Sequence, residues 1–238
     1  MTEKQKVAID NFRGIDKDDF LSKVAKAYMA ILGDGRGGVY CGNSLDLHKN
    51  WESKMRNSIG LGSFDVVITN PPFGKKLKID SEELLEDYDL GHAWKEGDNG
   101  EFEKGKVLDS QPPQILFIER CLDLLVDGGR LGIVLLESTF GMPKYRYVVD
   151  YLTRNAKLLA IVTLPEDTFQ PHTHAKTCVI IAEKTKPSKR HPIFMCDVKW
   201  CGHDSRGNPT IRVNENGERE LLDDVPNVTA IYKKGPRK

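Results

Sequence analysis

The stretch PPQILFIERCLDLLVDGGRLGIVLLE, residues 112–137, decides the fold that this sequence predicts. Its first half repeats apolar residues at helical spacing, and a pair of glycines follows. The remainder, LGIVLLE, is an almost continuous apolar run. Helical periodicity, then glycine, then an apolar run is typical of a helix that returns the chain to a buried strand. The stretch therefore predicts a right-handed helix-to-strand step in an α/β fold.

The segments on either side repeat this alternation. We predict helices over residues 20–31 and 145–155, and strands over 13–16, 39–45, 64–70, 157–164 and 176–184. Such an order indicates a Rossmann-like, mostly parallel sheet covered on both faces. The last two strands are joined without a helix, so we expect a hairpin and an antiparallel strand at the sheet edge.

Three further segments complete the predicted organisation. The glycine-rich run 33–38 follows a helix and is interpreted as its C-terminal turn. Residues 74–110 are polar and aperiodic, and we interpret them as an insertion over an active site. We expect residues 1–186 to form a partial catalytic domain and residues 187–238 a small β appendage.

Composition excludes several classes of protein. Lys plus Arg and Asp plus Glu both number 35, so there is no global positive charge that would itself indicate nucleic-acid binding. The longest apolar runs are too short for a membrane span, and five scattered cysteines favour reduced thiols and a cytoplasmic protein. Cys196, Cys201 and His203 are too few and too isolated to favour a metal site.

The residues Asn70, Pro71, Pro72 and Phe73 come directly after the apolar strand FDVVIT. Ligands of open α/β sheets bind beyond the carboxyl ends of strands. Prolines stiffen this turn and leave carbonyl oxygens free to accept hydrogen bonds from a substrate amine. Phe73 offers a flat face for an extruded base. We therefore expect NPPF to be catalytic; the simpler alternative is a turn.

FDVVITNPPFG resembles the catalytic motif of DNA methyltransferases that modify exocyclic amines. Residues 14–35, 111–138 and 164–181 resemble the modification subunits of type I restriction systems, and the resemblance extends from about Phe12 to about Lys186. It implies S-adenosylmethionine as methyl donor and N6 of a flipped adenine in DNA as acceptor. It also implies a specificity subunit, and with it a restriction subunit, as partners.

The resemblance also implies donor-binding residues. Asp16 matches the acidic position that binds the donor ribose, with a helix N-cap as the alternative role. Asn43 falls where the family often has Asp against the donor adenine, and a turn role is equally consistent with its position. Lys17, Ser44 and Asn70 complete the expected donor-binding set, and no metal is expected.

The family's glycine-rich donor loop should precede Asp16 by about twenty residues. Only fifteen residues precede it, and they contain no such loop. We therefore expect the central first strand of the sheet to be missing and the chain to be a fragment. Two other functions stay open: a truncated subunit that only binds partners, and a protein-glutamine or ribosomal RNA methyltransferase with an NPP(F/Y) motif.

Several side chains have open roles. Lys75, Lys76 and Lys78 follow the NPPF motif and could contact DNA phosphates, although a solvated loop would look the same. His172 and His174 could contact the target base, but loop packing is favoured. Phe169 is expected to pack in its loop.

Overall fold

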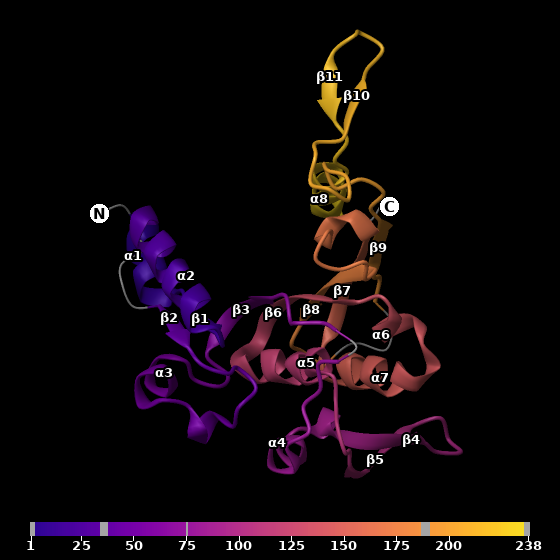
Figure 1. Ribbon diagram of the computed structural model, residues 1–238. Helices are drawn as coiled ribbons and strands as arrows, with labels where there is room; N and C mark the ends of the chain where they lie inside the picture. Colours follow the sequence, from indigo (N-terminus) through magenta and orange to yellow (C-terminus); the bar gives the residue numbers. More distant parts are fainter. Residues whose placement is uncertain (1–2, 34–37, 75, 187–190, 236–238) are drawn as a thin grey trace.

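A computed structural model describes residues 3–33, 38–74, 76–186 and 191–235 of the protein (Figure 1). Before the catalytic motif the chain forms α1 (Glu3–Asn11), β1 (Gly14–Asp16), α2 (Asp19–Leu32), β2 (Val39–Cys41), η1 (His48–Asn50), α3 (Ser53–Ser58) and β3 (Phe64–Thr69). The middle of the chain forms α4 (Glu82–Asp87), η2 (Asp89–Gly91), β4 (His92–Glu96), β5 (Phe102–Val107), α5 (Pro113–Leu124) and β6 (Leu125–Leu136). The remainder forms α6 (Ser138–Gly141), η3 (Pro143–Tyr145), α7 (Arg146–Asn155), β7 (Lys157–Leu164), η4 (Glu166–Phe169), β8 (Thr177–Glu183), β9 (Phe194–Asp197), β10 (Ile211–Val213), β11 (Arg219–Leu221) and α8 (Val225–Lys234).

The main sheet has five strands in the order β3-β6-β8-β7-β9. Strands β3 and β6 pair in parallel, as do β7 and β9, while β8 is antiparallel to both of its neighbours. Four of the five strands therefore run in the same direction. The predicted α/β fold with a mostly parallel sheet is confirmed.

The position of the antiparallel strand corrects one expectation. The hairpin of β7 and β8 forms as predicted, but β8 lies between β6 and β7 and not at the edge of the sheet. After β6, helix α7 leads the chain beyond the position next to β6 before β7 begins. Strand β8 then turns back and fills the position between β6 and β7. Strand β9 extends the sheet beyond β7.

Strands β1 and β2 form a separate parallel pair. Within the described residues no strand pairs with β3 on the side away from β6, so β3 ends the main sheet. In Figure 1, α1 and α2 project from this side of the molecule. Gly33 ends α2 with a φ of 80°, in the left-handed region that glycine tolerates, and its N–H is bonded back to the last turn. Residues 34–37 of the predicted glycine-rich turn lie outside the described residues.

Helix α5 forms the centre of the core because it is covered from two sides. The sheet lies on one side and the segment from α4 to β5 on the other (Figure 1). Ile115, Leu116 and Ile118 are consequently fully buried, and the polar Glu119 and Arg120 are buried as well. Strand β6 presents Leu131, Ile133 and Leu135 to the same core, with the alternation expected of a strand.

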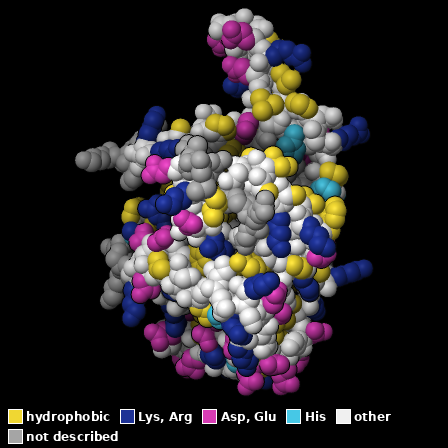
Figure 2. All heavy atoms as spheres, turned by 90° about the vertical axis from the view of Figure 1, so that its left-hand side faces the viewer, with side chains coloured by type: hydrophobic (Ala, Val, Ile, Leu, Met, Phe, Trp, Pro, Cys, Tyr) yellow, Lys and Arg dark blue, Asp and Glu magenta, His cyan; other side chains and the backbone are white. Residues whose placement is uncertain are grey.

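The segment 74–110 does not form the irregular insertion over the active site that we expected. Its apolar residues Leu84, Leu85, Tyr88 and Leu90 are buried, and they fold α4 and the β4–β5 hairpin against α5 and α7. Short apolar pairs separated by acidic residues concealed this helix in the sequence. Acidic side chains gather at this lower end of the molecule (Figure 2).

The C-terminal segment combines several elements. Strand β9 joins the main sheet, whereas β10 and β11 form a hairpin that projects from the molecule above α8 (Figure 1). The division of the chain at residue 186 stays a prediction, and residues 187–190 lie outside the described ones. No helix in the described part of the chain combines the length and apolar character needed to cross a membrane.

Candidate functional site

The candidate site is a cleft at the carboxyl ends of β1, β2 and β3. Its volume is about 790 Å³, within the range of small-molecule sites. Asp16 and Lys17 come from the end of β1, Asn43 and Ser44 follow β2, and Asn70 follows β3. The structure thus brings all the predicted donor-binding residues to one cleft.

Asp16 has one carboxylate oxygen committed to a local contact. Its Oδ1 accepts a hydrogen bond of 2.8 Å from the backbone N–H of Asp18. Asp18, and not Asp16, is the N-cap of α2, since its own carboxylate accepts from the N–H of Leu21 at 2.9 Å. Among the described residues no donor contacts Oδ2 of Asp16, so that oxygen can face a ligand in the cleft.

Asn43 is held in its own turn. Its Nδ2 donates to Asp46 Oδ1 at 2.6 Å, and its Oδ1 accepts from the N–H of Leu45 at 3.2 Å. This is the turn role that the sequence left open. One N–H of the amide and one oxygen lone pair stay available to a ligand.

A second hollow of about 380 Å³ lies on the other side of the catalytic motif. Asn70, Pro71 and Pro72 line both this hollow and the cleft, so the three residues form a shared wall. Asn70 and Pro72 are exposed and Pro71 is buried. The shared wall places residues of the motif against both spaces.

Two phenylalanines meet in the second hollow. Phe73 and Phe169 lie edge to face, with ring centroids 5.9 Å apart and an interplanar angle of 77°. Phe169 belongs to η4, in the link between β7 and β8. Its contact with Phe73 fits the loop packing that we expected, but its place beside the motif was not predicted. The available signal was its position in LPEDTFQPHTHA, a segment that already resembled the family.

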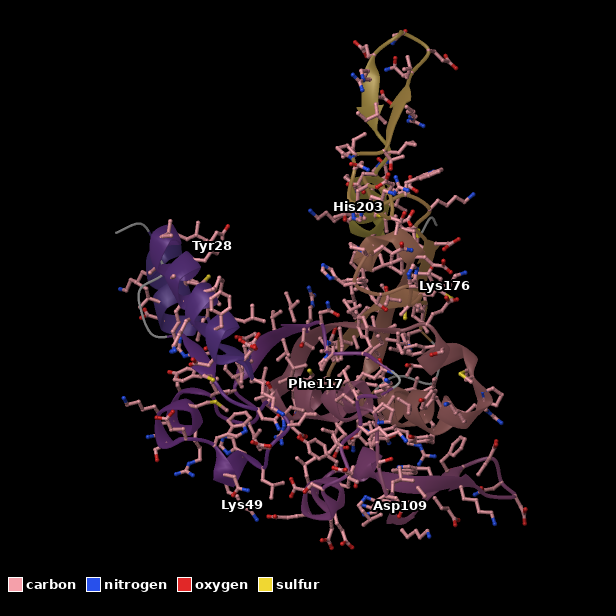
Figure 3. The ribbon with its side chains drawn as sticks, in the orientation of Figure 1. Tyr28, Lys49, Asp109, Phe117, Lys176 and His203 are labelled. Carbon is pink, nitrogen blue, oxygen red and sulfur yellow. The ribbon has the colours of Figure 1, made fainter. Side chains whose placement is uncertain are left out.

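The histidines and lysines near the motif separate in the structure. His172 lines the second hollow, whereas His174 does not. Lys78 lines the cleft, and Lys76 is exposed beside it. Lys75 lies outside the described residues. The sequence also missed Phe117 of α5, which lines the cleft and lies near the centre of the molecule (Figure 3).

Tyr88 and Arg120 support the wall of the cleft at Leu45 from behind. The Tyr88 hydroxyl donates to Leu45 O at 2.9 Å, and Arg120 Nε donates to Tyr88 Oη at 2.8 Å. Arg120 Nη2 also reaches Asp46 O at 3.1 Å. Burial raises the pKa of the Tyr88 phenol above its usual value although Arg120 opposes the shift. The phenol therefore stays a neutral donor.

Glu119, next to Arg120 on α5, anchors the segment that follows α4. Its carboxylate accepts from the backbone N–H groups of Asp89 and Leu90, at 2.9 and 2.8 Å. Burial raises the pKa of Glu119 to about 7, and the two N–H groups reduce the rise. The described residues contain no cluster of metal-binding side chains. Cys201 and His203 lie 3.7 Å apart as an isolated pair.

The chain is similar to known proteins in sequence and in fold. The family model described as N-6 DNA Methylase matches residues 2–219. The type I restriction enzyme EcoEI methylase subunit of Escherichia coli is 24% identical over an alignment of 184 residues, and the match covers 68% of this chain and 34% of that protein. The chain thus spans about a third of the length of this curated relative.

Two solved structures share the fold. The methyltransferase subunit of a type I restriction-modification system from Streptococcus thermophilus superposes with a TM-score of 0.60 at 17% identity, over 96% of this chain and 43% of that one. A protein from Listeria monocytogenes described as a class I S-adenosylmethionine-dependent methyltransferase gives a TM-score of 0.55 at 22% identity, over 79% and 49%. At these identities the likeness concerns the fold alone.

Proposed function

Because the chain belongs to the N-6 DNA Methylase family, we propose that it is the catalytic part of an adenine-N6 DNA methyltransferase subunit of a type I restriction-modification system. The observation that carries the proposal is the shared wall of Asn70, Pro71 and Pro72. Because these three residues lie between two hollows, they can contact a methyl donor in one hollow and a methyl acceptor in the other. Transfer of a group between two bound molecules requires that arrangement.

The cleft fits S-adenosylmethionine by its volume and its donor set. The free carboxylate oxygen of Asp16 is suited to accept hydrogen bonds from a ribose hydroxyl. Ser44 and Lys17 add polar groups, and the ring of Phe117 adds an apolar surface. When bound, S-adenosylmethionine supplies an electrophilic methyl group.

The second hollow fits a base extruded from DNA. The edge-to-face ring pair of Phe73 and Phe169 offers an aromatic face and a neighbouring edge to a flat heterocycle. The side-chain carbonyl of Asn70 and the carbonyl of Pro71 can each accept a hydrogen bond from an exocyclic amine. These bonds localise the lone pair of the nitrogen and orient it across the wall.

No strong base is needed beside the amine. Once the nitrogen carries the methyl group it is cationic and acidic, so one of its protons can pass to solvent water; until then the carbonyl groups accept hydrogen bonds from the N–H groups. The neutral net charge and the acidic lower end of the molecule favour a partner that reads DNA. We propose a specificity subunit for this role, together with a restriction subunit in the assembled system.

Replacement of Asn70 tests the proposal. In the whole subunit assembled with its specificity partner, we expect Asn70→Ala to lower N6-methyladenine formation by about 100-fold or more, the usual loss when one polarising group is removed. Mass spectrometry of digested DNA measures the product, with Asn227→Ala on α8 as the control. Asn227 is exposed and lines neither hollow.

The outcomes of this experiment are distinct. Undiminished methylation by the Asn70→Ala variant, with unchanged thermal unfolding, would refute the assigned role. Methylation of ribosomal RNA or of a protein glutamine, but not of DNA, would support the other methyltransferase classes. Calorimetric titration of this chain with S-adenosylmethionine tests the cleft separately, and no heat at millimolar donor would contradict donor binding by these residues.

A further inference from the structure

The turn that follows β2 fixes both ends of the Asn43 amide. Asn43 Nδ2 donates to Asp46 Oδ1 at 2.6 Å, and Asn43 Oδ1 accepts from the backbone N–H of Leu45 at 3.2 Å. A carboxylate accepts hydrogen bonds without donating them, and a backbone N–H only donates. An amide turned over would therefore set oxygen against oxygen and N–H against N–H. Asp46 and Leu45 together permit one orientation of this side chain.

Two buried side chains keep the backbone of the same turn in place. The Tyr88 hydroxyl donates to Leu45 O at 2.9 Å, and Arg120 Nη2 donates to Asp46 O at 3.1 Å. The N–H of Asp46 is also bonded to Asn43 O at 3.2 Å. The turn consequently cannot shift to suit an inverted amide without breaking bonds to Tyr88 and Arg120, which are both buried.

The fixed amide lies beside the carboxylate that we propose for the donor ribose. Asp16 and Cys41 are partners in the parallel β1–β2 pair, and Asn43 follows Cys41 by two residues at the same carboxyl edge. Asp16 and Asn43 both line the cleft. A nucleoside whose ribose contacts Asp16 therefore brings its base within reach of the Asn43 amide.

The free groups of the amide match one kind of purine edge. Among the described residues, only Asp46 and Leu45 bond to the Asn43 side chain, so one N–H and one oxygen lone pair are available to a base. A 6-aminopurine offers an N–H donor at position 6 with an acceptor nitrogen beside it, at N1 or N7. A 6-oxopurine offers an acceptor at position 6, with a donor at N1 and a second acceptor at N7. Its N1 edge requires the inverted amide, and its N7 edge leaves the amide oxygen without a donor.

We propose that Asp46 is a positioning residue through which the cleft selects a 6-aminopurine nucleoside over the 6-oxo counterpart. Asp46 does not line the cleft and acts through Asn43, whose carbonyl oxygen it keeps available to the amino group of the base. This selection rests on the proposed donor cleft and adds the residue that sets which base the donor carries. The Asn43 turn is thus part of the binding site as well as part of the fold.

The test compares two ligands that differ only at position 6 of the purine. S-Adenosylhomocysteine, which remains when the donor has lost its methyl group, has an amino group there, and S-inosylhomocysteine has an oxo group. Calorimetric titration of this chain measures the dissociation constant of each ligand, and their ratio measures base selection. We expect the natural protein to bind the amino ligand about 100-fold more tightly, because the oxo ligand leaves polar groups of the site unpaired.

Two substitutions of Asp46 should reduce this preference. Asp46→Ala removes the acceptor, whereas Asp46→Asn keeps the size of the side chain and adds an N–H that can pair with an inverted Asn43 amide. In each variant we expect the ratio to fall about 10-fold or more, the value of one hydrogen bond to a charged group. The hydrogen bond from Leu45 preserves the rest of the preference.

The matched controls are Asp65→Ala and Asp65→Asn. Asp65 is exposed on β3 and lines neither the cleft nor the second hollow. We expect the ratio to stay within about twofold in both controls, because a single surface substitution is nearly neutral. Thermal unfolding shows whether each variant is folded, and the near-isosteric Asp46→Asn carries the test if Asp46→Ala does not fold.

The outcomes separate selection by Asp46 from donor binding. An unchanged ratio in both Asp46 variants would overturn the proposal even if both affinities fall, because a purely structural role weakens the two ligands together. Equal binding of the two ligands by the natural protein would also overturn it and would leave the donor cleft standing. Binding of neither ligand at millimolar concentration would overturn both this proposal and the donor cleft. A lower ratio in either Asp46 variant, with unchanged controls, supports the proposal.

Discussion

Tyr88→Phe is expected to destabilise the protein far more than the loss of one oxygen atom suggests. Tyr88 is 1% exposed, and its hydroxyl is both a donor to Leu45 O and an acceptor from Arg120 Nε. The substitution removes about 1 kcal/mol for the neutral bond and about 1.5–3 kcal/mol for the bond to the charged guanidinium. It also leaves Arg120 Nε buried without that acceptor.

The expected loss is therefore about 2.5–4 kcal/mol in the free energy of unfolding, a large part of the 5–15 kcal/mol typical of a domain. Urea denaturation measures it as a lower midpoint with an unchanged slope. Tyr151→Phe is the control, because Tyr151 is half-buried and its hydroxyl bonds to no described residue. A loss below about 1 kcal/mol, or one equal to that of the control, would refute the supporting role of Tyr88 and Arg120.

Two further predictions concern titration and thiol reactivity. Burial raises the pKa of Glu119 in the folded state to about 7 from 4.5, so between these pH values the folded state binds a proton that the unfolded state has lost. The stabilisation that this proton provides is complete below pH 4.5 and is lost as the pH rises to 7. Urea denaturation of the natural protein and of Glu119→Gln measures the difference between their free energies of unfolding. We expect this difference to fall by up to about 3 kcal/mol between pH 4.5 and 8. A difference that does not change with pH would contradict the raised pKa. Burial raises the pKa of the Cys121 and Cys178 thiols to about 12. A disulfide reagent at pH 8 should therefore label the exposed Cys41 rapidly, and should label Cys121 and Cys178 only when the protein unfolds. Mass spectrometry measures the labelling rate of each cysteine. Equal rates for all three cysteines in the folded protein would show that the core is open to the reagent.

The sequence predicted the helices and strands whose local pattern of apolar residues matches the burial of those residues in the structure. The helix and strand within residues 112–137 appear as α5 and β6 because their apolar residues are covered on both sides. The predicted donor-binding residues meet in one cleft because parallel strands place their carboxyl ends at one edge of the sheet. Their roles stay predictions.

Tertiary pairing was harder to predict. No local signal distinguishes β8 inside the sheet from β8 at its edge, because both positions require an apolar strand. The place of Phe169 beside Phe73 likewise depends on how the β7–β8 link folds over the motif, not on its own neighbours in sequence. Among the described residues β1 and β2 pair apart from the main sheet, and the expectation of a missing central strand stays a prediction.

The interior position of β8 determines when the sheet can close during synthesis. Strands β6 and β7 do not pair with each other, and their common neighbour is made last of the three. Until residues 177–183 have left the ribosome, β6 and β7 each have an unpaired edge, and chains grow by only about 5–20 residues per second. The nascent protein therefore exposes the unpaired edges of two apolar strands for seconds. We expect a chaperone to bind the nascent chain most readily during this interval.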